Sequence, residues 1–500
     1  MAKKRPIPSL PPSQNHYLKS QSANKCNFSK TSGNHTIAKS SGYIAQMNLP
    51  NPLSTYFFNT TGQMIRGIHD DIYGQSSRLT RFCLLFRYMR AGRIFMSLVG
   101  ICCLFGLLTG CDRSTEQSPP QTRSQGVTDS EILLGSSLAL NGHASFLGTQ
   151  TLRGAMCYLN HVNANGGVHG RTIRVIAHDD SYDPPMCLVN TQRLIIDDQV
   201  FALFCYVGTP TTVRILPLIE EARIPLLGMF TGANALRDPF NRWLINVRAS
   251  YYQETRAAVH HLITDLGLKK IAVFYQYDAY GFDGLTGTEL ALKEFSLAPV
   301  VSGSYNRGTL DVQEGLSKII ASGAEAVVMI GTYDPCATFI KKADDLGYQG
   351  VFYLVSFVGA DELARRLEHH GNLTVLMSQV VPPPDRQNSS QLLTGETGYL
   401  TLLERYYPGD QPSFVGLEGF INARVLVEGL IRAGGDLTRD GFIQAIESIH
   451  DFSLGLDSNI SFSPTDHQGL DRVYFTRLEN GQFMLIKDWK DVRFHNSPSN

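Results

Sequence analysis

The sequence predicts an α/β protein built from two similar lobes, each with a parallel sheet covered by helices on both faces. Short apolar runs alternate with longer amphipathic stretches from residue 132 onward, and a second series of the same kind begins near residue 253. Apolar runs of about four to eight residues are typical of buried strands, and apolar residues three and four positions apart are typical of helices. Because strand–helix–strand units pair their strands in parallel, the alternation favours doubly wound, flavodoxin-like sheets.

The first series contains four apolar runs of strand length, separated by stretches with helical spacing. One helix opens with Pro184. Proline is favoured in a first turn because an N–H at that position would have no partner within the helix. The strands are expected at Ile132–Leu140, Ile173–Ala177, Val200–Cys205 and Ile224–Leu227, and the helices at Leu152–Ala164, Pro184–Ile196 and Thr211–Ala222.

The second series repeats this pattern after residues 243–248. Its strands are expected at Ile271–Tyr275, Val300–Tyr305, Ala326–Ile330 and Val351–Leu354, and its helices at Gln253–Leu266, Gly284–Phe295, Val312–Ala321 and Pro335–Leu346. Further elements are expected at Val375–Val381, Tyr399–Tyr407, Gly416–Ala433, Arg472–Leu478 and Phe483–Asp488, with no place yet in either sheet. Ligands of doubly wound sheets bind beyond the carboxyl ends of the strands, so the loops at those ends are the candidate site.

The segment 94–110 has no charged residue and is followed directly by Cys111. Its 17 residues fall short of the roughly 20 that cross a bilayer, and Arg87, Arg90 and Arg93 precede it. This layout predicts a secretory signal peptide at 89–110, followed by a polar linker at 111–128. The sequence 108–111 resembles a bacterial lipobox, which implies lipidation of Cys111. The alternative is a single membrane anchor retained in the mature chain.

The net charge of −1 is the sum of a basic N-terminal segment and an acidic remainder. Residues 1–93 hold thirteen basic and two acidic side chains, which leaves 31 basic and 43 acidic side chains in the rest. Residues 1–88 lack an apolar period, so we expect a disordered basic leader or an untranslated segment upstream of a start at Met89. The acidic remainder excludes a nucleic-acid partner, because such binding needs a basic stripe.

The cysteines show no metal-type spacing, and no cofactor or metal is expected. Cys187 and Cys205 are both expected at the carboxyl edge of the first sheet, where they can form a disulfide, whereas Cys157 and Cys336 are expected to be free and buried. The adjacent pairs His260-His261 and His369-His370 are expected to be solvated. No dinucleotide, phosphate-loop or Gly-x-Ser-x-Gly motif occurs, so an enzyme is not the expected class.

Several stretches together resemble the type I periplasmic solute-binding proteins of ABC transporters, in the Leu/Ile/Val-binding-protein-like (branched-chain amino acid) group. They are residues 154–171, 179–184, 202–211, 246–251 and 277–281. The resemblance implies two lobes joined by three hinge crossovers, with 129–248 and 379–455 in the first lobe and 249–378 and 456–490 in the second. It also implies closure of the lobes around a ligand.

The resemblance also implies which loops touch the ligand. The ligand carboxylate is expected against the loop Tyr206, Val207, Gly208 and Thr209 and the loop Phe230, Thr231, Gly232 and Ala233. Walls of the site are expected from Phe146, Leu147, Tyr251, Tyr280, Tyr333 and Phe357. The alternatives are plain turns for the two loops and packing between the lobes for the tyrosines.

Two departures from the group's pattern bear on the ligand. Amino-acid binders carry an acid just after the strand that here ends near Leu354, where this chain has none until Asp361, and Tyr206 replaces a small hydroxyl residue. The expected function is capture of a small carboxylate-bearing ligand (amino acid, amide or related organic acid) by a lipid-anchored extracytoplasmic protein and its delivery to an ABC permease. The alternatives are a ligand-sensing receptor subunit and an exported α/β hydrolase or amidase.

Overall fold

A computed structural model of the chain describes residues 124–368, 370, 373–385, 390–455 and 458–492. All of them belong to one of the two units into which the chain divides, Thr115–Asn500. The expected leader, signal peptide and lipidated Cys111 lie outside the described residues. Among the described helices, none is both long enough and apolar enough to cross a membrane.

The first lobe is built on a five-stranded parallel sheet with the strand order β2-β1-β3-β4-β5. The strands are β1 (Glu131–Leu138), β2 (Thr172–Asp179), β3 (Ala202–Phe204), β4 (Leu226–Leu227) and β5 (Leu244–Ile245). This is the flavodoxin-like order, in which ligand sites lie beyond the carboxyl edge of the sheet. The predicted fold class is confirmed for this lobe.

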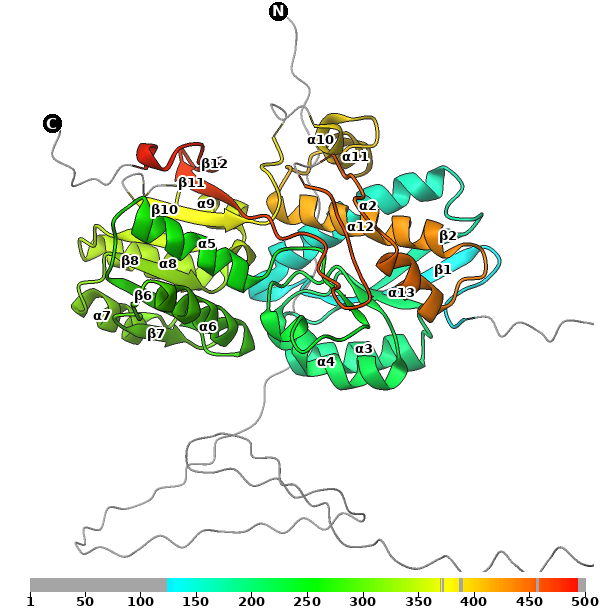
Figure 1. Cartoon of the computed structure of the whole chain (residues 1–500), viewed down its shortest axis with the longest axis horizontal. Helices are drawn as coiled ribbons and strands as arrows, with labels where there is room; N and C mark the ends of the chain where they lie inside the picture. Colours follow the sequence, from blue (N-terminus) through cyan, green and yellow to red (C-terminus); the bar gives the residue numbers. More distant parts are fainter. Residues whose placement is uncertain (1–123, 369, 371–372, 386–389, 456–457, 493–500) are drawn as a thin grey trace, which may run out of the picture. The chain divides into compact units, whose positions relative to one another are not determined.

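Helices cover both faces of this sheet (Figure 1). One face carries α3 (Pro184–Ile196) and α4 (Thr209–Ala222), and the other carries α2 (Ser145–Ala164) and α12 (Phe414–Ala433). The lobe also contains α10 (Gln391–Thr394), α11 (Tyr399–Tyr406) and α13 (Arg439–Glu447). Helices α2 and α12 touch backbone to backbone, because a Cβ placed on Gly154 would lie 1.8 Å from the carbonyl oxygen of Gly416.

The second lobe is built on a seven-stranded sheet with the order β12-β11-β10-β9-β8-β6-β7. Its parallel strands are β6 (Ile271–Gln276), β7 (Ser302–Tyr305), β8 (Ala326–Ile330), β9 (Val351–Leu354) and β10 (Thr374–Gln379). The antiparallel strands β11 (Tyr474–Glu479) and β12 (Gln482–Leu485) extend one edge. Helices α5 (Tyr251–Thr264) and α6 (Ala279–Glu294) pack together, as do α7 (Gln313–Ala321), α8 (Tyr333–Asp345) and α9 (Ala360–Arg366).

The chain passes between the sheets three times: from β5 to α5, from β10 to α10, and from α13 to β11. The first and third crossovers are hydrogen bonded to each other, since Asn246 N–H donates to His467 O and Gly469 N–H donates to Asn246 O, both at 2.8 Å. The guanidinium of Arg237 binds both crossovers, at Arg248 O (3.0 Å) and at Gln468 Oε1 (2.9 Å). These hydrogen bonds therefore hold the first and third crossovers together.

The structure also places the elements that the sequence left unassigned. The expected strand at Val375–Val381 is β10, and the last two expected strands are β11 and β12, so all three join the second sheet. Helix α6 starts at Ala279, five residues before the expected start, because the Asp278 side chain accepts the Tyr280 N–H (3.1 Å) and caps the first turn.

The predicted disulfide between Cys187 and Cys205 is wrong. Both cysteines are free and buried. Cys187 lies in the first turn of α3, whereas the Cys205 thiol faces Asn422 of α12 at 3.8 Å, and these helices cover opposite faces of the first sheet. Cys157 and Cys336 are free and buried, as predicted.

Candidate functional site

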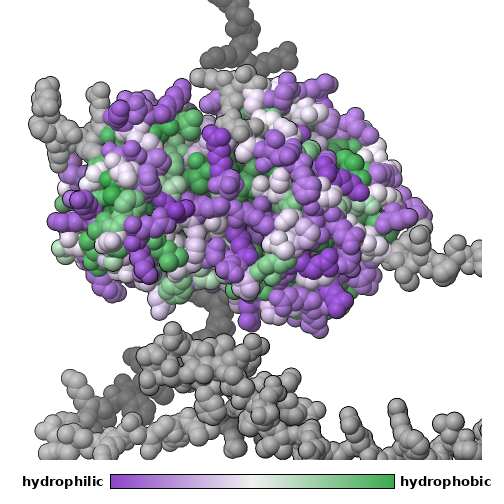
Figure 2. Space-filling view, viewed as in Figure 1, coloured by the Kyte–Doolittle hydropathy of each residue, from purple (hydrophilic) through white to green (hydrophobic). Residues whose placement is uncertain are grey.

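Five aromatic side chains from both lobes meet at the carboxyl ends of the two sheets. Tyr182 follows β2 and Phe230 follows β4, while Tyr251 opens α5, Tyr280 lies in the first turn of α6 and Phe357 follows β9 in the short helix η3 (Ser356–Val358). Each of the five is at most 1% exposed. We call them the aromatic cluster. On the face shown in Figure 2, hydrophilic and hydrophobic residues are interspersed.

Phe357 lies in the middle of the aromatic cluster. Its ring centroid is 4.7 Å from that of Tyr280, 5.5 Å from Phe230, 5.9 Å from Tyr182 and 6.5 Å from Tyr251. These distances and tilts are those of favourable aromatic contacts. Rings of the first lobe thus pack directly on a ring of the second lobe, so the structure shows the lobes closed.

Hydroxyl groups border the aromatic cluster. The hydroxyls of Thr209, which opens α4, and Thr231, which follows β4, share a hydrogen bond of 2.7 Å. The Tyr251 hydroxyl lies next to Thr231, but it forms no hydrogen bond of good geometry with any described residue. Burial raises the pKa of Tyr251, so this hydroxyl stays protonated. A buried hydroxyl without a partner is costly unless a ligand or water satisfies it.

A buried polar chain connects Tyr182 of the first lobe to the second lobe. The Gln276 amide donates to the Tyr182 hydroxyl (3.3 Å), and its Oε1 accepts from the Tyr305 hydroxyl (2.9 Å). The Tyr305 hydroxyl in turn accepts from the backbone N–H of Thr332 (3.0 Å). Burial raises the pKa of Tyr182 and Tyr305 well above the ordinary value, so the chain consists of neutral groups.

A cation borders the aromatic cluster beside β7. Arg307 forms an ion pair with Asp278 (3.0 Å), and its guanidinium lies 5.8 Å from the ring centre of Tyr182. Burial lowers the pKa of His143 in the first lobe, and the Arg307 charge lowers it further. This side of the site therefore has a positively charged arginine facing a neutral histidine.

A second cation, Arg248 of the first crossover, lies beneath the aromatic cluster. It is 2% exposed, pairs with Glu254 (3.1 Å) and Glu418 (3.3 Å), and faces the ring centres of Phe230 (5.2 Å) and Tyr251 (5.7 Å). Burial raises the pKa of Glu418 to about 7 although Arg248 opposes the shift. Burial lowers the pKa of Arg248, but the two carboxylates outweigh it and the net shift is upward.

Glu254 supplies a carboxylate at the position where the sequence shows none. It comes from α5, and it accepts the Ser356 N–H (2.8 Å) and the Ser356 hydroxyl (2.9 Å) directly after β9. It also accepts from Ser378 of β10 and from Arg248. The carboxylate therefore fixes η3, and with it Phe357, and is fully engaged in doing so.

Comparison with known proteins decides the family. A family model described as periplasmic binding protein matches residues 131–482. The chain belongs to this family. Membership implies an extracytoplasmic location.

One of the relatives of this periplasmic binding protein carries the expected group name. The chain is 25% identical over 316 residues to the Leu/Ile/Val-binding protein homolog 7 of Brucella abortus (strain 2308), covering 61% of this chain and 78% of that protein. It is 24% identical over 234 residues to the amino acid binding protein of Pseudomonas aeruginosa, covering 47% of this chain and 63% of that protein. The match thus spans less than two thirds of the second relative.

Solved structures agree with this assignment. A possible leucine/isoleucine/valine-binding protein from Rhodopirellula baltica SH 1 is 32% identical, with a TM-score of 0.68 over 75% of this chain and all of that one. A branched chain amino acid ABC transporter protein from Thermus thermophilus with bound valine is 19% identical, with a TM-score of 0.65 over 72% of this chain and 97% of that one, and shows the shared fold. The resemblance predicted from the sequence is confirmed.

Three of the expected wall residues of this periplasmic binding protein form a second contact between the lobes. Phe146 of α2 meets Tyr333 of α8 edge-on, with centroids 6.5 Å apart. Leu147 is fully buried beside Gly359, where a Cβ would lie 2.9 Å from the leucine Cδ2. Arg366 covers the Tyr333 ring at 4.3 Å. These residues flank the stretch that carries Phe357.

Most residues of the two expected carboxylate loops border the aromatic cluster. Val207 pairs with the Phe230 backbone as an isolated bridge. Gly208 has φ 102°, and a Cβ there would lie 2.1 Å from the Tyr182 ring, so only glycine fits. Gly232 O accepts the Tyr251 N–H at 2.7 Å, and Ala233 O accepts from Arg237 (2.8 Å).

Tyr206 does not join the cluster. Its hydroxyl lies 3.0 Å from the hydroxyl of Thr191 on α3, in the core of the first lobe. Tyr182, Gln276 and Arg307 join the site although the sequence did not single them out. For Tyr182 a signal existed, because the stretch 179–184 follows a strand. Asp180 Oδ1 accepts the Tyr182 N–H (2.9 Å) and holds this residue at φ 62°.

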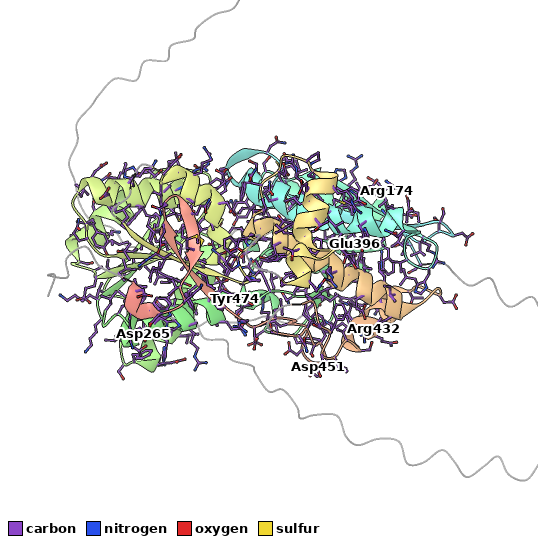
Figure 3. The ribbon with its side chains drawn as sticks, turned by 90° about the horizontal axis from the view of Figure 1, so that it is seen from above. Arg174, Asp265, Glu396, Arg432, Asp451 and Tyr474 are labelled. Atoms are coloured by element: carbon purple, nitrogen blue, oxygen red, sulfur yellow. The ribbon has the colours of Figure 1, made fainter. Side chains whose placement is uncertain are left out.

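One group of possible metal ligands lies away from the site, at the C-terminal end of α5. The ligand atoms of His260, His261 and Asp265 lie within 4.8 Å of one another. His261 Nδ1 is 2.6 Å from Asp265, and its ring stacks on Trp489 at 4.2 Å. Figure 3 shows Asp265 beside the C-terminal segment η4 (Trp489–Asp491). These contacts fasten η4 to α5, which accounts for the group without a metal.

Proposed function

We propose that this chain is a lipid-anchored extracytoplasmic solute-binding protein that captures a small carboxylate-bearing ligand between its lobes and delivers it to an ABC permease. The observation that carries the proposal is the contact between Phe230 of the first lobe and Phe357 of the second, 5.5 Å apart within the buried aromatic cluster. Loops at the carboxyl ends of both sheets therefore share one site, as a ligand that bridges two lobes requires.

Binding works through a shift between open and closed lobes. A ligand that touches both lobes favours the closed state by its difference in affinity for the two states. In the first lobe, the hydroxyls of Thr209 and Thr231 and the N-terminal amides of α4 are suited to a carboxylate, since a helix N-terminus attracts anions. In the second lobe, Tyr280 and Phe357 offer apolar faces to the rest of the ligand.

The first experiment identifies the ligand and separates a binder from an enzyme. The protein is purified under native conditions and denatured, and the released small molecule is identified by mass spectrometry. Added back, this molecule should raise the melting temperature with increasing concentration and should be recovered unchanged. Conversion of the molecule, or the absence of any stabilising compound in a panel of carboxylates, amino acids and amides, would contradict the proposal.

A matched pair of variants tests the site. Thr231→Val removes a hydroxyl at the expected carboxylate position and should weaken binding of the identified ligand by about tenfold, which corresponds to roughly 1.4 kcal/mol. Thr286→Val makes the same change on an exposed position of α6, where the hydroxyl bonds to Phe282 O of its own helix and lies outside the aromatic cluster. Equal affinities of the two variants would count against the site.

The anchor and the partner need separate tests. Labelling with a fatty-acid analogue should mark the protein, and Cys111→Ser should abolish the label and leave the protein unprocessed. N-terminal sequencing of the precursor should begin at Met89. Co-purification with a permease supports uptake, whereas capture by a receptor protein instead supports the sensing alternative.

A further inference from the structure

We infer that the ligand of this site carries a carboxylate but no ammonium group, so that the protein selects an aryl or alkyl carboxylic acid over the α-amino acid with the same side chain. The inference rests on the proposed function and specifies the ligand of the same site. It follows from the hydrogen bonds and ion pairs that the charged groups around the aromatic cluster already form.

A buried ligand ammonium needs a carboxylate partner, because an unpaired buried charge is strongly unfavourable. Glu254 reaches the stretch after β9, but its oxygens already accept from Arg248, from Ser356 and from Ser378. Glu254 moreover shares its ion pair with Arg248 with a second carboxylate, Glu418. An ammonium could gain Glu254 only by displacing these hydrogen-bond donors.

The other carboxylates near the aromatic cluster are occupied as well. Asp278 accepts from Arg307 (3.0 Å), from the Gln276 amide (2.8 Å) and from the Tyr280 N–H (3.1 Å). Asp180 accepts from the Ser137 hydroxyl and the Tyr182 N–H, and Asp283 accepts from the Asn234 N–H. None of these four carboxylates is free to meet a ligand cation.

A cage of aromatic rings can also hold a cation, and here that possibility is disfavoured. Arg248 already faces Phe230 and Tyr251, and Arg307 already faces Tyr182, all at distances below 6 Å. Three of the five rings thus carry a guanidinium, and an ammonium placed among them would meet like charges in a buried setting. Both guanidinium groups therefore keep these ring faces from a ligand ammonium.

The remaining faces suit an apolar body with one anionic end. The Thr209 and Thr231 hydroxyls and the start of α4 face the carboxylate, and the rings of Tyr280 and Phe357 face the apolar part. Because Phe357 fills the middle of the closed cluster, its ring must turn aside when a ligand enters. None of these contacts serves an amine. The Asp361 carboxylate, whose buried Oδ2 has no hydrogen-bond partner among the described residues, lies on α9 against the Phe414 backbone and is not part of the aromatic cluster.

The experiment compares acids with their amino acids by isothermal titration of the full purified protein, freed of bound ligand by denaturation and refolding. The pairs are 3-phenylpropanoate with phenylalanine and 4-methylpentanoate with leucine. In at least one pair the acid should bind ten times more tightly or better than the amino acid. Equal or tighter binding of the amino acid overturns the inference but leaves the proposed function standing.

Two further outcomes are also decisive. If neither pair binds, the molecule released from native protein takes their place: a carboxylate without an amine supports the inference, and an amine overturns it. If no small molecule is released and nothing in the panel of carboxylates, amino acids and amides binds, both the inference and the proposed function fail.

Variants of Arg307 test whether its charge causes the preference for the acid over the amino acid. Arg307→Gln leaves Asp278 without its cation, so the preference for acid over amino acid should fall at least fivefold, whereas Arg307→Lys should keep it. A purely structural role of Arg307 would weaken both ligands of a pair alike. Arg256→Gln, which breaks an exposed ion pair between Arg256 of α5 and Glu294 of α6, is the matched control and should change nothing. An unchanged preference in Arg307→Gln contradicts the inference.

Discussion

Asp283 on α6 of the second lobe accepts the backbone N–H of Asn234 in the first lobe through both carboxylate oxygens, each at 3.0 Å. The Ala235 N–H approaches the same carboxylate at 3.4 Å. The contact fastens the lobes together at a point outside the aromatic cluster. Because it joins one lobe to the other, we expect its free energy to favour the closed arrangement.

Asp283→Ala should therefore weaken ligand binding. The change removes the acceptor and leaves the Asn234 N–H without a partner, at a cost of about 1 kcal/mol, which is roughly a fivefold loss of affinity. Titration calorimetry measures the loss. Asp345→Ala changes an exposed aspartate at the end of α8 and should bind like the wild type. If the two variants bind equally well, the lobes do not depend on this contact.

Glu418 should make the stability of the protein depend on pH. Because burial raises its pKa to about 7 in the folded state, the folded state binds this proton more tightly than the unfolded state does. Its contribution is complete below the ordinary glutamate pKa and is lost as pH rises through about 7. Melting temperatures between pH 4 and pH 8 should thus fall less steeply toward pH 8 in Glu418→Gln. The exposed Glu294→Gln should keep the wild-type slope.

Gly154→Ala should destabilise the first lobe. A methyl group at this position would collide with the Gly416 carbonyl of α12, so the two helices must separate, at a cost of about 1–3 kcal/mol. Urea unfolding followed by circular dichroism measures the change. Gly435→Ala is the control, because no atom lies within 4 Å of the added methyl. A variant as stable as the wild type would show that the helices do not touch here.

The four cysteines of the described residues should all be found as thiols. All four are buried, and burial raises the pKa of Cys157 to about 12 and shifts the other three upward. Iodoacetamide should modify none of them in the native protein and all of them after unfolding without reductant. A peptide joining Cys187 to Cys205 in the mass spectrum would restore the disulfide that the structure rules out.

The periodic parts of the fold could be predicted from the sequence because buried strands and amphipathic helices each impose their own spacing on apolar residues. The expected strand Ala326–Ile330 is β8 with the same bounds. The two-residue strand β5 could not be found this way, since so short a run has no period of its own. The placement of β11 and β12 in the second sheet depends on pairing between distant segments, which local pattern does not contain.

The candidate site could be predicted only in part. The loops were found because they follow strands, but the direction of each side chain depends on the backbone beyond the end of the strand, where Cys205 has φ 54°. Cys205 faces α12 and the next residue, Tyr206, faces α3, so a tyrosine in the right loop points into the core. Arg307 and Glu254 come from elements that adjoin the site only through tertiary packing. Their roles could not be read from spacing.

The three passages between the sheets determine what recombination of the gene can exchange. Strands β11 and β12 complete the second lobe, although they follow helices α12 and α13 of the first. Neither lobe is therefore encoded by one continuous stretch of the gene. A single recombination between relatives therefore cannot exchange one complete lobe, so the two halves of the site are expected to diverge by substitutions in their loops and not by exchange of whole lobes.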